Sequence, residues 1–306
     1  MVKICFTLII AIISLLCFES FGLAAQRNCT DLEEKKADKL LFLSHEEQKA
    51  SIDMHLPWGL PISSNQATNE KLLVNHEYII KYDEDILVPI WTAYRLTKDD
   101  IVKADRVDCF RRDPRVTSSE FPTPKDYKEP VYDQGHMTPR AAMNRSLMSV
   151  INTYIMTNMT PQHADFNRHV WRRVETLVRG WAKKKGAIQV ITGSVFDHNL
   201  DGKRDSDEVV KRVPTGRVGV PSHLYKIVLH ETDNGKIESI TLLLPNWPWK
   251  PRKRGSEKLS EKIDKYLKAN ITSIKEVESL TGIDYKVIGS LAQIKAIKNA
   301  KGEALW

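Results

Sequence analysis

Five runs of apolar, β-branched and aromatic residues constrain the fold of this chain most. They lie at residues 77–85, 87–97, 187–196, 223–231 and 237–246. The first two flank an acidic turn and predict a β-hairpin, and the other three predict further strands. Helical patterns occupy residues 163–184 and 257–269, and the sequence contains no internal repeat and no linker rich in Gly, Ser or Pro. This distribution predicts an α+β fold in one domain.

The N-terminus predicts a secretory signal peptide over residues 1–25. Lys3 precedes an apolar run from Ile4 to Phe18, and small residues follow up to Ala25. The run is short for a membrane span, although a retained N-terminal anchor is the alternative. No later stretch reaches the roughly 18 apolar residues of a spanning helix. We therefore expect a secreted, extracellular protein.

The remaining chain divides into an N-terminal extension over residues 26–56 and a main domain over residues 57–306. Residues 30–56 are charged and Leu-spaced, a pattern compatible with a helix. Cys29 and Cys109 remain after signal cleavage, and an oxidising compartment favours one disulfide between them, with an intermolecular bridge as the alternative. The formal net charge of +7 favours a polyanionic partner only slightly.

The helix predicted at residues 163–184 carries two rows of side chains. An apolar stripe that should face the core consists of Val170, Val174, Leu177 and Trp181. A neighbouring row in steps of four consists of Asn167, Trp171, Glu175 and Arg179. Taken alone, the second row can be a solvated flank with a Glu–Arg pair.

A polar knot, "DQGHMTP" at residues 133–139, supplies a candidate base. Hydrolysis of a phosphodiester needs a base for water, positive charge on the phosphate and help for the leaving oxygen. His136 offers an imidazole with an ordinary pKa near 6.5, and a buried turn histidine is the alternative interpretation. A Mg²⁺ ion can do the other two tasks while bound to only one or two protein oxygens.

These motifs resemble those of the DNA/RNA non-specific endonucleases with the ββα-metal fold. That family has Asp-Arg-Gly-His, then Asn-x-x-Pro-Gln, then Asn-x-x-x-Trp-x-x-x-Glu on a helix. The chain has "DQGHMTP", "TNMTPQ" and "NRHVWRRVETLVR" in the same order. The similarity extends over most of the mature chain, from "VPIWTAYRLTKD" to "ESLTGIDY". It is strongest to the secreted animal branch and to the nuclease-like domain of ectonucleotide pyrophosphatase/phosphodiesterases.

The resemblance implies a role for each matching residue. His136 corresponds to the general base and Asn167 to the single protein ligand of a catalytic Mg²⁺, for which Mn²⁺ can substitute. Glu175 corresponds to a carboxylate that orients water on the metal, and Arg179 to a cation that stabilises phosphate charge.

Two further positions, Asn158 and Gln162, correspond to residues that brace the site. Asn158 also begins one of four N-glycosylation sequons, with Asn28, Asn144 and Asn270. Because Asn158 should point inward, we expect its sequon to be unused, whereas any exposed sequon can make the protein a glycoprotein.

One position departs from the family pattern, since Gln134 stands where the family has Arg. A neutral amide lacks the bidentate, charged phosphate contact of a guanidinium. The departure predicts either an enzyme with altered rate or substrate preference, or a weakened or inactive nuclease-like protein that binds nucleic acid. Other cations can compensate, and the candidates are Arg140, Arg111, Arg112 and Arg115.

A second metal site is predicted in "DHNLDGKRDSDE" at residues 197–208. It matches the pattern of a calcium loop at Asp197, Asn199, Asp201, Lys203, Asp205 and Glu208, with Gly202 at the turn. An acidic surface turn is the alternative to a structural Ca²⁺. Further on, "PNWPW" precedes the basic run "KPRKR", which can contact nucleic acid or form a solvated loop.

The sequence therefore predicts a secreted, Mg²⁺-dependent endonuclease that cuts DNA, and it leaves open whether RNA is also a substrate. The main alternative is a catalytically silent member of the fold that binds nucleic acid. A calcium-regulated extracellular binding protein is a third hypothesis, which depends on residues 197–208 alone.

Overall fold

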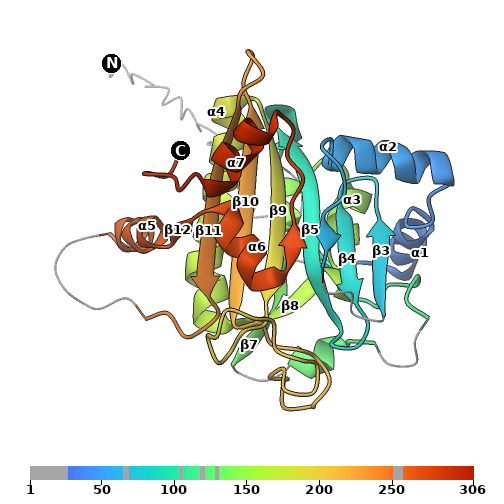
Figure 1. Cartoon of the computed structure of the whole chain (residues 1–306). Helices are drawn as coiled ribbons and strands as arrows, with labels where there is room; N and C mark the ends of the chain where they lie inside the picture. The colour runs from blue at the N-terminus through green and yellow to red at the C-terminus, as the bar shows by residue number, and fades with distance from the viewer. Residues whose placement is uncertain (1–26, 65–68, 104–105, 118–120, 128–130, 251–257) are drawn as a thin grey trace, which may run out of the picture.

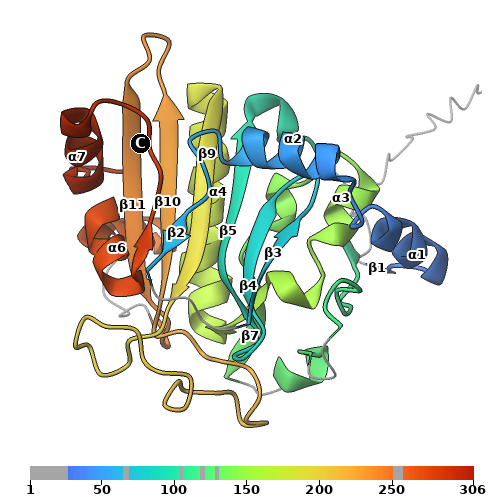
Figure 2. The same cartoon turned by 45° about the vertical axis from the view of Figure 1, so that its right-hand side comes forward.

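The fold is a three-layer arrangement of helices on both faces of an antiparallel sheet (Figures 1 and 2). The computed structural model describes residues 27–64, 69–103, 106–117, 121–127, 131–250 and 258–306. The predicted signal peptide lies outside these residues. In the described part, no helix combines the length and apolar character that a membrane span requires.

The central sheet has seven strands, and every neighbouring pair in it is antiparallel. In spatial order they are β12 (Ile271–Thr272), β11 (Ile237–Pro245), β10 (His223–Glu231), β9 (Ala187–Val195), β5 (Val88–Thr97), β4 (Ile79–Asp83) and β3 (Glu70–Val74). The five predicted strands are thus confirmed, and so is the α+β class. β3 was not predicted, because it lies in a stretch that reads as a polar loop.

Each face of the sheet has its own apolar core, as the side-chain alternation of strands requires. In β5, Trp91 and Ala93 face one core, and Tyr94 and Leu96 face the other. The helices that contribute to the first core are α2 (His45–His55), α6 (Ile274–Thr281) and α7 (Leu291–Asn299). The second core includes α4 (Arg172–Lys185) and α5 (Leu259–Ala269).

The N-terminal extension forms two helices rather than the single helix that its spacing suggested. α1 (Asp31–Lys39) ends before α2 begins, because Ser44 caps α2. The Ser44 hydroxyl accepts from the backbone N–H of Glu47, whose carboxylate accepts from the backbone N–H of Ser44. This reciprocal capping box fixes a new helix start.

The predicted disulfide is present and joins Cys29 to Cys109 within the chain. It links the segment before α1 to β6 (Val107–Asp108), beside the parallel pairing of β1 (Arg27–Asn28) with β6. Another small sheet pairs β13 (Ile283–Asp284) with β2 (Ile62–Ser63). The Cys29–Cys109 disulfide and the β1–β6 pairing together fix the segment that begins at residue 106 against the body of the protein.

The polar knot lies mostly in a strand, and this strand positions the site. β7 (Tyr132–His136) pairs with β8 (Met159–His163) in a separate antiparallel sheet, with His136 opposite Met159. Between them lie α3 (Leu147–Asn152) and the short 3₁₀ turns η3 (Arg140–Ala142) and η4 (Met156–Asn158). Two more 3₁₀ turns are η1 (Lys98–Asp100) and η2 (Pro124–Tyr127). β8 leads through a π-helical turn, η5 (Phe166–Trp171), directly into α4.

Candidate active site

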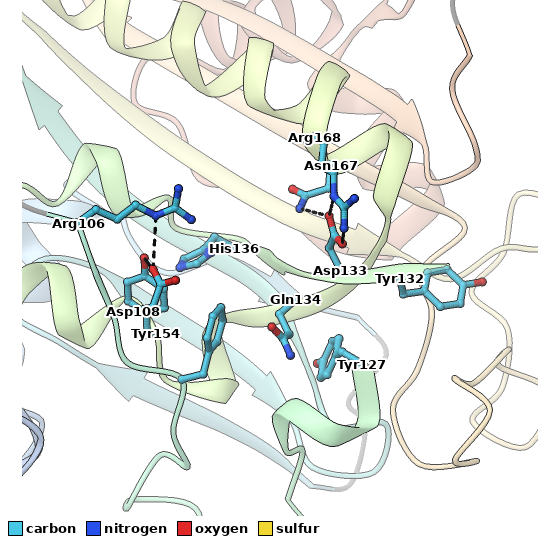
Figure 3. A pocket seen from close by; sticks show the side chains of 11 residues that line it. Arg106, Asp108, Tyr127, Tyr132, Asp133, Gln134, His136, Tyr154, Asn167 and Arg168 are labelled. Carbon is cyan, nitrogen blue, oxygen red and sulfur yellow. Dashed lines mark hydrogen bonds and ion pairs between the residues drawn. The ribbon is translucent and has the colours of Figure 1, made fainter. Parts of the chain in front are cut away.

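A cavity of about 430 Å³ opens beside β7 and η5 (Figure 3). Of the predicted site residues, His136, Gln134 and Asn167 line it. The other residues that line it are Arg106, Asp108, Phe110, Tyr127, Tyr132, Asp133, Tyr154 and Arg168. The cavity therefore brings the predicted base and the predicted metal ligand to one place, from the end of β7 and the start of η5.

The ring of His136 is held by aromatic packing. Its centroid lies 4.9 Å from that of Tyr154 in an edge-on arrangement and 6.1 Å from that of Phe110. Burial, with a further contribution from the charge of Arg140, lowers the pKa of His136 to about 3, whereas Asp108 opposes the shift. Since the ring remains neutral at physiological pH, it is able to accept a proton.

Asn158 fixes the backbone that follows His136. It is fully buried, and its amide oxygen accepts from the backbone N–H of Thr138 at 2.9 Å. Its amide nitrogen donates to the carbonyl oxygens of Thr138, at 2.9 Å, and Thr153, at 2.8 Å. A buried amide with three bonds to the backbone is a rigid brace for the turn after His136.

Gly135 allows Gln162 to lie across β7. A Cβ on Gly135 would sit 2.1 Å from Cδ of Gln162, closer than any real contact. Gln162 is fully buried, and neither atom of its side-chain amide has a partner among the described residues. The glycine before His136 is thus required by the close approach of the neighbouring strand.

Asn167 is oriented by an acid at the start of β7. Its amide nitrogen donates to Asp133 at 3.0 Å, and Arg168 forms a two-pronged ion pair with the same carboxylate, at 2.6 and 2.9 Å (Figure 3). With its nitrogen engaged in this way, Asn167 is left with its amide oxygen as the free coordinating atom.

Glu175 and Arg179 do not line the cavity. The predicted row assumed a continuous α-helix from Asn167 onward, but η5 is a π-helical turn. Its wider turn changes the direction of Asn167 relative to Glu175, so the even steps of four do not hold across Trp171. Trp171 is buried, and its indole N–H donates to the carbonyl oxygen of His136 at 3.2 Å.

Several cations, of which Lys226 is buried, lie within electrostatic range of Glu175 on α4. Burial raises the pKa of the Glu175 carboxyl, against the opposing charges of Lys226, Arg179 and Arg140. Lys226 is itself buried, donates to the hydroxyl of Thr192 at 2.5 Å and has its pKa lowered to about 8 by burial. This arrangement combines one carboxyl with several cations next to the cavity.

Arg140 acts electrostatically on both His136, which lines the cavity, and Glu175, which does not. Its charge lowers the pKa of both His136 and Glu175, so it lies within electrostatic range of both. Gln134, in contrast, donates its amide to the carbonyl oxygen of Pro124 at 3.0 Å. Of the candidate cations, Arg140 is therefore the one whose position fits compensation for Gln134.

The other three candidate arginines make contacts within the protein, and none of them lines the cavity. Arg111 is buried and donates to Asp38, the carbonyl oxygen of Ile151 and the side chain of Asn152. Arg115 pairs with buried Asp113 at 2.7 Å. Arg112 donates to the carbonyl oxygen of Val116 and lies over the ring of Phe121.

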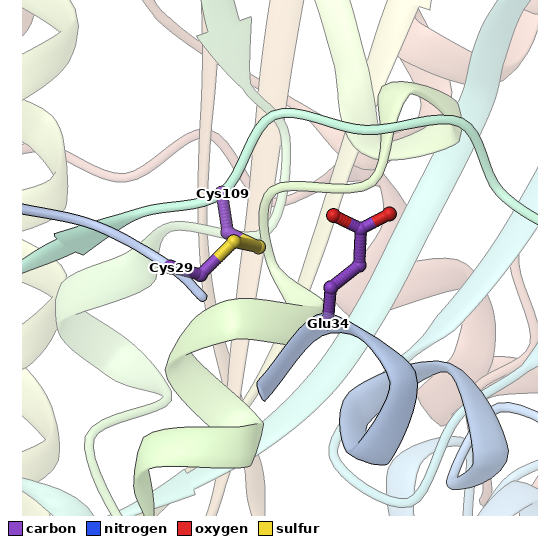
Figure 4. Close-up of side chains that lie close together, drawn as sticks. All are labelled: Cys29, Glu34 and Cys109. Atoms are coloured by element: carbon purple, nitrogen blue, oxygen red, sulfur yellow. A yellow bond between two sulfur atoms is a disulfide. The ribbon is translucent and has the colours of Figure 1, made fainter. Parts of the chain in front are cut away.

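The donor set of the cavity fits a hard, hydrated cation such as Mg²⁺. Such an ion needs only one or two protein oxygens, and the amide oxygen of Asn167 can provide one. Within the described residues, one group of three His, Cys, Asp or Glu ligands converges, formed by Cys29, Glu34 and Cys109. Because the two sulfurs are bonded to each other, this group is not a metal site (Figure 4).

The predicted calcium loop has a partly ordered ligand set. Asp197 is buried and accepts from the backbone N–H groups of Asp201 and Gly202, both at 3.1 Å. Asn199 donates to Asp201 at 3.0 Å. Asp205, however, accepts from His198, and Lys203 and Glu208 are exposed. The backbone of the loop thus turns around the Asp197 carboxylate, and the binding of Ca²⁺ by this loop stays a prediction.

Two site residues, Arg106 and Asp108, escaped prediction from the sequence. The Arg106 guanidinium lies 3.5 Å from the Asp108 carboxylate, which also accepts the Tyr154 hydroxyl at 2.7 Å. The available signal was their position next to Cys109, since a disulfide fixes this segment in the wall of the cavity.

Comparison with known proteins identifies one family. A family model described as DNA/RNA non-specific endonuclease matches residues 60–287. Nuclease C1 of Cunninghamella echinulata var. echinulata is 33% identical over 186 residues, which cover 58% of this chain and 73% of that protein.

Two longer proteins are similar over more of the chain. Venom phosphodiesterase 2 of Crotalus adamanteus is 26% identical over 278 residues, 84% of this chain and 33% of its own length. Ectonucleotide pyrophosphatase/phosphodiesterase family member 3 of Mus musculus is 26% identical over 276 residues, 85% of this chain and 31% of its own. The chain therefore spans about a third of the length of these phosphodiesterases.

Proposed function

We propose that this chain, which belongs to the DNA/RNA non-specific endonuclease family, is a Mg²⁺-dependent phosphodiester hydrolase that cuts DNA and RNA within the strand. The observation that carries the proposal is the shared cavity of His136 and Asn167. Members of this family are metal-dependent nucleases, generally with Mg²⁺, and Mn²⁺ is the expected substitute here.

In the proposed reaction, neutral His136 takes a proton from the attacking water while the water oxygen bonds to phosphorus and the bond from phosphorus to the leaving oxygen breaks. The low pKa leaves the ring unprotonated before the reaction, but a base acts best when its pKa lies near the working pH, so the role requires the pKa of His136 to rise when the negatively charged phosphate binds. Asn167 would hold the Mg²⁺ through its amide oxygen, and the bound ion would supply positive charge for the leaving oxygen. Arg140 and Arg106 would stabilise the charge on the phosphate. Glu175 lies outside the lining of the cavity, so the role in orienting water that its motif implies would have to be exercised from α4, behind the cavity wall.

We also propose that the protein works outside the cell. The Cys29–Cys109 disulfide is stable in an oxidising compartment. The predicted signal peptide gives a route to such a compartment, and one of the similar proteins is named a venom phosphodiesterase.

The first test compares cleavage by the wild type with cleavage by His136→Ala, on plasmid DNA and on ribosomal RNA with Mg²⁺. Loss of a positioned base should lower the rate about 10²- to 10⁴-fold. His45→Ala is the matched control, because His45 is exposed on α2, away from the cavity. Asn167→Ala should raise the Mg²⁺ concentration needed for half-maximal rate, and Asn167→Asp should restore binding in part.

A catalytically silent nucleic-acid-binding protein is the second candidate, favoured by Gln134 at the position of the family arginine. The same assay separates the two functions. Cleavage no greater than that of His136→Ala at any Mg²⁺ or Mn²⁺ concentration, with the fold retained by circular dichroism, would refute the enzyme. Salt-sensitive binding of DNA would then support the silent protein.

A further inference from the structure

Two pairs of rings lie near the ends of strands, one pair on β7 and β8 and the other at the start of β10 and just after β11. We call Tyr132, His163, Trp247 and His223 the aromatic row. The Tyr132 and His163 rings lie 5.5 Å apart at an angle of 66°, and the Trp247 and His223 rings lie 6.5 Å apart at 56°. Tyr132 also lines the cavity, at the end opposite His136 (Figure 3). Tyr132 therefore places the first pair of the row at the edge of the cavity.

Asn246 holds the two halves of the row together. This residue precedes Trp247 and is only 9% exposed. Its amide oxygen accepts from the backbone N–H of His163 at 2.8 Å. Its amide nitrogen donates to the carbonyl oxygens of Pro161, at 2.9 Å, and Pro221, at 3.0 Å. Three bonds to three segments keep the base of Trp247 rigid beside His163.

Trp247 is nonetheless 52% exposed. The other indole of "PNWPW" behaves differently, because Trp249 packs against the core, with its ring 5.9 Å from that of Tyr266. A single exposed apolar side chain is ordinary on a protein surface. An exposed indole on a rigid base, in line with other rings, is instead a stacking platform.

Positive charge lies along the same row. The Lys211 ammonium is 6.0 Å from the centre of the Tyr132 ring. Its charge also contributes, after burial, to lowering the pKa of His163, whose Nδ1 is buried without a partner among the described residues. Rings with an adjacent cation form the pattern by which proteins bind single strands, through base stacking and phosphate attraction.

We propose that the aromatic row is a subsite in which the exposed Trp247 stacks an unpaired base of the polynucleotide at a distance from the cleaved bond, while the 7% exposed Tyr132 supports the row. The inference rests on the proposed function and adds a preference for single-stranded stretches. Tyr132 lies four residues from His136 along a strand, or about 13 Å at the usual rise per residue. A base bound at the row therefore belongs to a nucleotide other than the one that carries the scissile phosphate.

The test measures binding without cleavage. In the His136→Ala background, a fluorescein-labelled 12-nucleotide single strand is titrated by anisotropy. Trp247→Ala should weaken binding about 5- to 100-fold, the effect of losing one stacked base. Trp247→Phe should retain most of the affinity, and Phe42→Ala, which removes a 63% exposed ring between α1 and α2, should leave it unchanged.

Three outcomes would overturn the subsite. These are equal affinity of Trp247→Ala and its parent, the same loss for Trp247→Phe as for Trp247→Ala, or an equal loss on a duplex, which offers no unpaired bases. Measuring cleavage by the wild type separates failure of this proposal from failure of the proposed function. If the wild type cleaves neither DNA nor bis(p-nitrophenyl) phosphate, the nuclease proposal fails, while the binding titration still decides on the row.

In active enzyme, the loss in kcat/KM for Trp247→Ala should be at least fivefold greater on the single strand than on bis(p-nitrophenyl) phosphate. That small diester reaches the cavity without spanning the row. Equal losses on both substrates would mean that Trp247 acts on the catalytic site itself, which contradicts base stacking.

Discussion

At the scale of single residues, the site depends on amides and glycine as much as on charged groups. Asn158 braces the turn after His136, and Gly135 admits Gln162 across the strand. Asn167 is oriented through Asp133. These contacts fix the positions of His136 and Asn167, which in the proposed reaction would reduce the entropic cost of bringing the reacting groups together.

Gln134→Arg is expected to strengthen binding of DNA. Gln134 lines the cavity with a neutral amide, and a guanidinium there would add a charged phosphate contact. We expect kcat/KM to rise several-fold at low salt, and the slope of log kcat/KM against log salt concentration to steepen by about 1. Gln134→Met, of similar length without charge, is the control. An unchanged slope would mean that position 134 does not reach a phosphate.

At the scale of elements, the strands with a regular apolar pattern were predictable from the sequence, whereas elements determined by local contacts were missed. The core strands were predictable because apolar residues recur along them, as in β5, β9 and β10. β7 escaped because it pairs outside the central sheet, and its polar residues serve the cavity. The π-helical turn η5 was missed, because the spacing of residues 163–184 indicated one continuous α-helix. This turn moves Asn167 out of the predicted row that contains Glu175. Motifs thus pointed to three residues that line the cavity, Gln134, His136 and Asn167, but not to Arg106 and Asp108 or to the arrangement of the side chains.

The packing of α2 on the sheet should make the protein sensitive to mild acid. His55 is 1% exposed, its Nδ1 accepts from the backbone N–H of Arg95 at 3.0 Å, and its Nε2 lies 2.9 Å from the carbonyl oxygen of His76. These contacts fit a neutral ring that donates from Nε2. Burial lowers the pKa of His55 to about 4, below the value near 6.5 of an unfolded histidine.

Between pH 6.5 and pH 4, the unfolded chain therefore binds a proton at His55 that the folded chain does not. The free energy of unfolding should fall by up to about 3 kcal/mol as the pH is lowered through this window. Urea denaturation at pH 7 and pH 4.5 measures the change. His55→Gln should be less stable at pH 7 but lose less on acidification, and His45→Gln on the exposed side of α2 should behave as wild type. Equal acid losses in all three proteins would exclude His55 as the cause.

At the scale of the whole molecule, one covalent bond connects the N-terminal extension to the cavity. The Cys29–Cys109 disulfide closes a loop with a sequence separation of 80 residues, and Cys109 stands between Asp108 and Phe110 in the wall of the cavity. The extension is therefore part of the framework that supports the site.

Cys29→Ser with Cys109→Ser should lower the free energy of unfolding by about 4 kcal/mol, from the entropy that a loop of this length returns to the unfolded chain. We expect KM to rise more than kcat falls, because Arg106 and Asp108 lose their anchor. Denaturation of the double variant and of reduced wild type should agree. A loss below about 1 kcal/mol would mean that the β1–β6 pairing alone holds the wall.

The buried amide of Asn158 also bears on how the protein is made. Asn158, Met159 and Thr160 form a glycan acceptor signal in which both the asparagine and the threonine are fully buried. A sugar attached there during synthesis cannot coexist with the bonds to Thr138 and Thr153. In a host that glycosylates, chain folding competes with the transferase at this position. Only the molecules in which folding occurs first will carry an assembled site, and a host without that enzyme removes the competition.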